Sequence, residues 1–267
     1  MQEINRELTI YGHVLNGFLT SAVSVPIVHP GYTLCSHFLI HKNVNELMTG
    51  GRPNFRVIYR GIGANWACDM SGQVIAFWSY GYFQSLSIKH RECIGGVAAG
   101  IIAAPIFNMW DRIMTLQHIS GDSMKLTVKK IKRAEGLKGL FKGSSLTCMQ
   151  EILYQTTFFS LSNKMADKIE KKTNTNPIFS RVISYSATGA IIGLVTSPLQ
   201  HVKILLMGEL NSESITVIAK KAFSPEKIKE VILFTKMRTS LITLNMFVAG
   251  LIKEFIPLLL PSSFKVD

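Results

Sequence analysis

Two carboxylates, Asp69 and Glu151, lie inside long apolar stretches of the sequence. A charged side chain within a membrane-spanning segment is costly unless it forms an ion pair or meets water. Arg112 or Lys203, basic residues in similar stretches, would satisfy these carboxylates in a purely structural role. Unpaired carboxylates would instead indicate a wet cavity that favours a cationic or zwitterionic solute. Asp111 and Arg112 are adjacent, and we expect them to form ion pairs or to extend toward the membrane surface rather than to bind solute.

The other reactive residues form no catalytic or metal-binding pattern. His37 and His41 are four residues apart, a spacing that can hold a metal. Because neither an HExxH context nor a third ligand accompanies them, we interpret them as residues near the end of a helix without a metal-binding role. Four cysteines without CxxC spacing are interpreted as reduced structural thiols: Cys35, Cys68, Cys93 and Cys148. GxSxG, Walker A and glycine-rich dinucleotide motifs are absent from the sequence. We therefore expect no enzyme, metal or cofactor.

Composition and apolar stretches indicate a membrane protein. The 267 residues have a mean hydropathy of +0.24 and are only 17% charged, below the usual quarter for soluble domains. Six stretches are long enough to cross about 30 Å of hydrocarbon: 14–40, 62–86, 94–118, 144–166, 178–207 and 236–260. Polar residues interrupt several of them, which a bundle around a wet cavity tolerates. We predict one all-α membrane domain over 1–267, with six transmembrane helices around a central cavity.

The charges of the loops predict the orientation of these helices. Connections after the first, third and fifth spans hold 17 Lys and Arg residues, including Lys236 and Arg238, against nine on the opposite side. By the positive-inside rule these three loops, with short surface helices, face the matrix or cytoplasm-like side, and both termini face the other side. The net charge of +12 then reflects contact with anionic lipid rather than nucleic acid.

The first 13 residues do not resemble a targeting peptide. Glu3 and Glu7 stand beside a single Arg6, unlike a basic signal-peptide start or an acid-poor transit peptide. We therefore expect no cleavable targeting peptide and an internal targeting signal.

A threefold repeat underlies the six spans. Residues 59–61 (YRG) recur as 141–143 (FKG), 82 residues later, and Pro30 and Pro198 are separated by about twice that distance. Three units fit the length, approximately 10–90, 91–172 and 173–267. In each, a proline region is expected to end an apolar helix, a basic loop follows, and an aromatic-basic-glycine triplet opens the next helix. In the third unit the nearest candidate triplet is 234–236 (FTK).

These residues resemble the mitochondrial carrier family, whose units carry PxDxxK on the first helix and EGxxxxFKG before the second. Residues 135–143 (EGLKGLFKG) match the second motif in full, and 198–203 (PLQHVK) best keep the first. Unit one offers 30–35 (PGYTLC), and unit two has either Asn108 or Pro105 at the proline position. Gly96xxxGly100 and Gly189xxxGly193 agree with the family's tight helix packing.

The resemblance implies a matrix-side gate, in which prolines kink the helices and the residues after them form interhelical ion pairs. The implied gate residues of units one and three are Pro30, Tyr32, Cys35, Pro198, Gln200 and Lys203. Unit two offers Trp110 and Ile113, or Phe107 and Trp110. Lys203 alone keeps a charge, with Tyr32 and Gln200 as candidate hydrogen-bond partners. A gate of three ion pairs therefore cannot be built.

The resemblance also implies solute contacts in the middle of each second helix. Counting from Gly61 and Gly143 gives Cys68 and Asp69, then Gln150 and Glu151, and the uncertain third register suggests Thr243. The arginine that is frequent at the first of these positions is missing. Asn65 and Gln73, after the triplet at 59–61, are similar to residues of adenine-nucleotide carriers. This similarity is weak evidence for a nucleotide, because the cations that would neutralise its phosphates are absent.

The family further implies cardiolipin sites at the second-helix starts, here Arg60, Gly61, Lys142 and Gly143, and a monomer. A merely solvated basic face over residues 125–142 stays open as the alternative. The implied function is alternating-access transport of a small metabolite across the mitochondrial inner membrane. A nucleotide and an amino or keto acid stay open as solutes. The alternative is a carrier-derived scaffold, receptor or insertase that no longer transports, which the eroded gate favours.

Overall fold

The computed structural model describes residues 10–40, 48–49, 52–86, 88–208, 210 and 214–259. Helices dominate these residues, as predicted for an all-α protein. Six of them are long: α1 (Ile10–Ile40), α3 (Ile62–Gln84), α4 (Arg91–Ser120), α6 (Ser144–Thr173), α7 (Pro177–Gly208) and α9 (Ile228–Leu259). The shorter elements are β1 (Met48–Thr49), β2 (Arg52–Pro53), α2 (Phe55–Ile58), α5 (Met124–Glu135), η2 (Leu137–Phe141), α8 (Ile215–Ala222) and η3 (Pro225–Lys227). The two short strands pair antiparallel.

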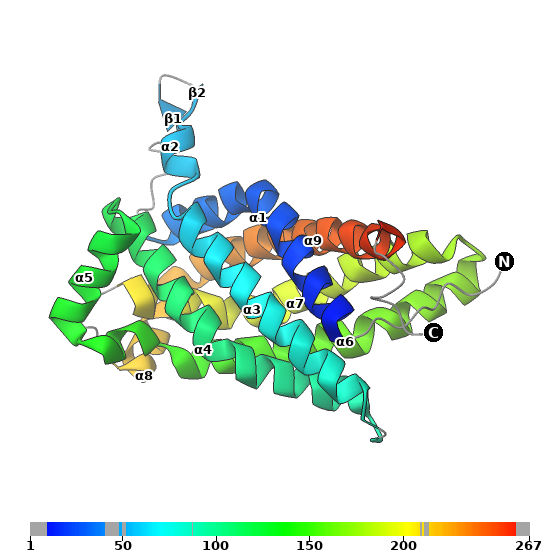
Figure 1. Cartoon of the computed structure of the whole chain (residues 1–267). Coiled ribbons are helices and arrows are strands. Elements are labelled where there is room, and N and C mark those ends of the chain that lie inside the picture. Colours follow the sequence, from blue (N-terminus) through cyan, green and yellow to red (C-terminus); the bar gives the residue numbers. More distant parts are fainter. Residues whose placement is uncertain are drawn as a thin grey trace.

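The six long helices run alongside one another (Figure 1), and their contacts close them into a ring. Each packs against the next long helix along the chain, and α9 packs against α1. Helices α1, α4 and α7 also contact one another pairwise. Each predicted span falls on one of these six helices, although all of them except α3 begin earlier or end later than predicted. The ring therefore places six helix faces toward a common interior.

The same close backbone contact occurs in three helix pairs. A Cβ atom added to a glycine of the first helix would lie 3.0–3.1 Å from a carbonyl oxygen of the second: Gly17 from Gln73, Gly96 from Gln155, and Gly189 from Ile242. A side chain at these points would push the helices apart, so glycine allows their close approach. These contacts align α1–α3, α4–α6 and α7–α9 residue by residue.

The prolines do not end their helices, contrary to the sequence-based expectation. α1 continues past Pro30 to Ile40, and α7 continues past Pro198 to Gly208. A proline inside a membrane helix is tolerated because neighbouring helices and local adjustments satisfy the freed backbone groups. The aligned glycines also change the assignment, because Pro26, Pro105 and Pro198 each follow one of them by nine residues. By this spacing Pro26, rather than Pro30, has the same position relative to its glycine as Pro105 and Pro198, and the gate role of Pro30 stays a prediction.

Two of the three second helices begin at a left-handed glycine. Gly61 precedes α3 with φ +80°, and Gly143 precedes α6 with φ +86°, a conformation that costs glycine little. The third second helix begins differently, because η3 leads directly into α9 at Ile228 with φ −58°. Residues 234–236 lie inside α9 and do not open it, so the proposed third triplet is wrong.

Each long helix presents large apolar side chains to the outside of the ring. Examples are Ile27 on α1, Trp78 on α3, Ile101 on α4, Met149 on α6, Leu194 on α7 and Leu244 on α9. By length and hydropathy, α4, α7 and Pro225–Phe255 qualify as membrane spans within the described residues. Apolar residues on the outside and polar residues inside are the arrangement expected of a helical bundle in lipid.

Candidate functional site

Charged side chains from five long helices meet in the interior of the ring. One helical turn before the three aligned carbonyl oxygens stand Asp69 on α3, Glu151 on α6 and Arg238 on α9. Electrostatic interactions link Glu151 to Asp69, to Arg238, to Asp111 on α4 and to Lys203 on α7. We call these five residues the central charge layer. It holds three carboxylates and two cations.

Lys203 forms an ion pair with Asp111 across α7 and α4. Its Nζ donates to Asp111 Oδ2 at 2.6 Å, and the two side chains are 1% and 18% exposed. The expected partners of Lys203 were Tyr32 and Gln200, and neither hydrogen bond is found among the described residues. The expectation that Asp111 and Arg112 form ion pairs is confirmed, but their partners lie on different elements, because Arg112 pairs with Glu135 at 3.0 Å.

Asp69 and Glu151 therefore lack the cations that a purely structural role would provide. Arg112 and Lys203, the two proposed partners, are engaged with Glu135 and Asp111. Glu151 is buried and accepts a 3.5 Å hydrogen bond from the Gln155 amide. Among the described side chains, the half-buried Asp69 carboxylate has no ion pair or hydrogen bond. These two carboxylates remain available to a ligand.

Arg238 is the interior residue that the sequence did not reveal. It is buried, and its Nη1 donates to Thr196 Oγ1 at 2.7 Å and to Ser197 Oγ at 3.4 Å. The loop-charge count assigned it to the matrix side, because the last span was predicted to begin only two residues earlier. The signal that points to it is the one that identified Asp69, namely a charge within an apolar stretch.

Polar and aromatic residues surround the central charge layer. The predicted contacts Cys68 and Gln150 are buried, and Cys68 Sγ donates to the Phe107 carbonyl oxygen at 3.7 Å. Tyr32 and Tyr154 are half-buried and interact electrostatically with Asp69 and Arg238. Tyr32 thus belongs beside the layer. The site combines carboxylates, a guanidinium, amides and aromatic faces.

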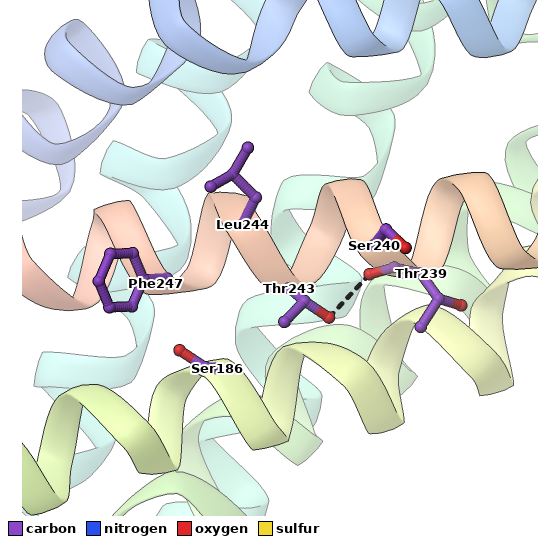
Figure 2. A pocket seen from close by; sticks show the side chains of 6 residues that line it. All are labelled: Ser186, Thr239, Ser240, Thr243, Leu244 and Phe247. Carbon is purple, nitrogen blue, oxygen red and sulfur yellow. Dashed lines mark hydrogen bonds between the residues drawn. The ribbon is translucent and has the colours of Figure 1, made fainter.

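Thr243 lies in a different place from the other predicted contacts. It lines a groove of about 450 Å³ between α7 and α9, together with Ser186, Thr239, Ser240, Leu244 and Phe247 (Figure 2). Its hydroxyl donates to the Thr239 carbonyl oxygen at 2.8 Å. Leu244 and Phe247 are exposed, so the groove opens on the outside of the ring. A solute contact at Thr243 stays a prediction, while Arg238 occupies the position equivalent to Asp69 and Glu151.

The residues at the aligned gate positions are mostly uncharged. Two and five residues after the aligned prolines stand Val28 and Gly31, Phe107 and Trp110, and Gln200 and Lys203. In this region an apolar cluster joins α1, α7 and α9: Val28, Cys35, Leu39, Ile204, Phe234 and Leu241. Contacts within this cluster are therefore apolar, whereas the Lys203 ammonium pairs with Asp111.

The predicted lipid-binding residues are tied into the protein. Lys142 Nζ donates to Glu135 Oε1 at 3.0 Å, and Glu135 also holds Arg112. The Arg60 carbonyl oxygen, just before Gly61, accepts hydrogen bonds at 3.0 Å from the ring nitrogens of His29 and His118. These contacts fix both helix starts without engaging the Arg60 side chain. Elsewhere, no group of three or more metal-ligating side chains is found in the described part of the chain, and His41 lies outside it.

Comparison with known proteins agrees with this architecture. A family model described as "Mitochondrial carrier protein" matches residues 90–173, which comprise α4, α5, η2 and α6. The mitochondrial nicotinamide adenine dinucleotide transporter 2 of Arabidopsis thaliana is 28% identical over 123 residues, 42% of this chain and 34% of the relative. The mitochondrial glycine transporter of Kluyveromyces lactis is 23% identical over 121 residues, 42% of this chain and 40% of the relative.

A third relative extends the match along the chain. Mitochondrial substrate carrier family protein X of Dictyostelium discoideum is 22% identical over 157 residues, 55% of this chain and 52% of the relative. The chain thus spans between about a third and a half of the length of the curated relatives it matches. The matched segment of the family model contains the complete motif at 135–143, and the relatives carry carrier or transporter names. These matches support the identification of the chain as a divergent member of the mitochondrial carrier family.

Proposed function

We propose that this chain moves a small metabolite across the mitochondrial inner membrane by alternating access. The observation that carries the proposal is the set of Asp69, Glu151 and Arg238, which stand at aligned positions of three helix pairs without an ion-pair partner among the described residues. Unpaired charges inside a membrane bundle are costly. A bound solute would satisfy them.

The proposal includes six membrane spans in three pseudo-repeats, 10–90, 91–172 and 173–267. Three helices qualify as spans on length and hydropathy alone. The other three, α1, α3 and α6, also expose large apolar side chains. The three aligned glycine contacts support the repeats. The basic loops around α5 and α8 are proposed to face the matrix.

Localisation and surroundings follow from the same family assignment. Two of the relatives are named as mitochondrial transporters, and we place this chain in the mitochondrial inner membrane as a monomer. Anionic lipid, with cardiolipin as the candidate, is proposed to bind the starts of α3 and α6, where Arg60 and Gly61, and Lys142 and Gly143, lie. Residues 1–9 fall outside the described part of the chain, so the expected absence of a cleavable targeting peptide stays a prediction.

The Asp111–Lys203 pair provides a way to couple solute binding to the gate. Lys203 also interacts electrostatically with Glu151, so a cation bound at Glu151 changes the field at Lys203. A desolvated ion pair is marginal because the loss of hydration offsets most of the attraction. A solute that weakens this pair would therefore favour separation of α4 and α7.

Transport in proteoliposomes tests the proposal. The purified full chain is reconstituted, and exchange is measured against a panel of nucleotides, keto acids and amino acids. We expect Asp69→Ala or Glu151→Ala to abolish exchange while thermal unfolding in detergent shows a folded protein. Unchanged exchange in both variants would remove the central charge layer as the solute site.

A second candidate is a carrier-derived scaffold, receptor or insertase without transport. The uncharged residues at most aligned gate positions, Val28, Gly31, Phe107 and Trp110, favour it, because a docking surface needs no reciprocal ion-pair gates. Failure to exchange any compound of the panel, together with robust co-purification of a protein partner, would support this candidate over transport.

A further inference from the structure

The central charge layer is not electrically balanced. Asp111 and Lys203 neutralise each other at 2.6 Å. The remaining members, Asp69, Glu151 and Arg238, have no ion-pair partner among the described residues, which leaves two carboxylates against one guanidinium. In a poorly solvated interior an uncompensated charge is costly. With both carboxylates ionised, the occupant that balances this set carries one net positive charge.

The hydrogen-bonding groups around the layer are mainly acceptors. Gln155 is fully buried and donates its amide N–H to Glu151, which leaves its Oε1 as a buried acceptor without a partner among the described residues. Gln150, next to Glu151, is also buried, and its Oε1 is likewise unpartnered there. A buried acceptor without a donor costs free energy. These amide oxygens, added to the two carboxylates, require an occupant rich in N–H donors.

Aromatic rings provide the third element of the site. Tyr32 on α1 and Tyr154 on α6 are half-buried and lie close enough to Asp69 to interact with it electrostatically. Aromatic faces stabilise ammonium and guanidinium groups, and more strongly where water is excluded. Tyrosines beside carboxylates therefore favour an organic cation over a small hydrated metal ion.

Arg238 determines which acidic group the solute must carry. Its guanidinium donates to the hydroxyls of Thr196 and Ser197 and has no carboxylate partner among the described residues. A guanidinium donates two parallel N–H hydrogen bonds to a carboxylate, a two-point contact that a hydroxyl cannot replace. One such cation suits one carboxylate, whereas the several phosphates of a nucleotide, or a dicarboxylate, would meet Asp69 and Glu151 with repulsion.

We infer that the solute is a basic amino acid, with its carboxylate at Arg238 and its two cationic groups against Asp69 and Glu151. This inference rests on the proposed transport function and specifies its substrate class. Two positive groups and one carboxylate match two carboxylates and one guanidinium. Ammonium or guanidinium N–H groups supply the donors that Gln150 and Gln155 lack.

The test measures uptake of radiolabelled arginine and lysine into proteoliposomes preloaded with the same compound. Glycine, ADP, NAD and 2-oxoglutarate are measured in parallel. We expect saturable uptake of arginine or lysine to exceed that of the other compounds. Asp69→Asn and Glu151→Gln should each lower it about ten- to a hundredfold, the usual cost of removing one charged contact. Asp167→Asn and Glu226→Gln, matched changes at exposed positions, should leave uptake unchanged.

Agmatine, which is arginine without its carboxylate, tests the role of Arg238. The native chain should prefer arginine to agmatine, and Arg238→Gln should remove this preference because it removes the carboxylate partner. An unchanged preference would overturn the assignment of Arg238. Exchange of glycine, nucleotides or 2-oxoglutarate without arginine or lysine would overturn the substrate class but leave the transport function intact. No exchange of any compound by folded protein would overturn both.

Discussion

Breaking the Asp111–Lys203 ion pair should destabilise the ring by an amount that can be estimated. Two unit charges about 4 Å apart attract by about 4 kcal/mol at an effective dielectric constant of about 20. Lys203 is 1% exposed, so Asp111→Asn leaves an ammonium group almost without water. Removal of one partner of a buried pair typically costs about 3–5 kcal/mol. We expect about 3 kcal/mol, because Glu151 still interacts with Lys203.

A double-mutant cycle separates the pair from its surroundings. Lys203→Met should cost a similar amount, because Asp111 then joins Asp69 and Glu151 as a third uncompensated carboxylate. The double variant should cost only about 1 kcal/mol, since neutral replacement of both partners is often tolerated. For a chain of this length, 3 kcal/mol corresponds to roughly 6–12 °C in the midpoint of thermal unfolding.

The assay is thermal unfolding of detergent-purified protein, with Arg133→Gln on exposed α5 as the control for loss of a charge. Single variants that lower the midpoint by less than a degree would refute the estimate. A double variant whose loss equals the sum of the two single losses would refute the coupling between Asp111 and Lys203. Either result would also remove this pair from the proposed gate.

Three further predictions concern contacts that hold the ring together. Glu135→Gln should cost about 3 kcal/mol in thermal unfolding, because it removes the carboxylate that pairs with the buried Arg112 and the half-buried Lys142. The control is Asp122→Asn, which removes the ion pair with the exposed Lys130 and should have no measurable effect. Gly100→Ala should cost about 1–3 kcal/mol, because the added Cβ would lie 2.7 Å from Ile152 Cα on α6. Gly63→Ala, whose added Cβ has its nearest neighbour at 3.6 Å, should be neutral or stabilising. Equal effects of the two changes on the unfolding midpoint would contradict the role of close packing. Asn108→Ala should cost about 2 kcal/mol, since the buried amide donates to the Leu140 carbonyl oxygen at 3.1 Å and accepts from Thr147 at 2.8 Å, and an unchanged unfolding midpoint would exclude that contribution.

The starts of α3 and α6 could be predicted from the sequence because each is determined locally. Gly61 and Gly143 adopt left-handed conformations immediately before those helices, and a triplet ending in glycine is visible in one dimension. The third start could not be predicted in this way. α9 is entered from a 3₁₀ turn at residues 225–227, which needs no glycine and leaves no comparable signal.

The prolines of α1 illustrate a limit of spacing arguments. Both Pro26 and Pro30 lie inside the helix, and the sequence offers no local reason to choose between them. The contact of Gly17 with Gln73 decides in favour of Pro26, because it sets the register of α1 against α3. Such a contact between distant segments is a property of packing. The position of Tyr32 beside Asp69 follows from that register as well.

The interior charges were predictable in proportion to how clearly each one interrupts an apolar stretch. Asp69 and Glu151 stand well inside predicted spans, so the cost of burying a carboxylate identified them. Arg238 stands near the predicted start of its span, where a cation is normally solvated, and was therefore counted with the loop. Because α9 begins at Ile228, ten residues earlier, Arg238 is instead carried into the ring.

The balance of charges in the ring bears on whether the chain transports or only provides a platform. A scaffold gains nothing from unpaired charges at Asp69, Glu151 and Arg238, because neutral side chains of similar size would remove their desolvation cost. Of the six aligned gate positions only that of Lys203 carries a charge, so the fold forms without charges at the others. The unpaired charges of the central charge layer therefore carry a desolvation cost that packing does not offset. Binding of a complementary solute in this layer would offset that desolvation cost, which favours transport over the scaffold role.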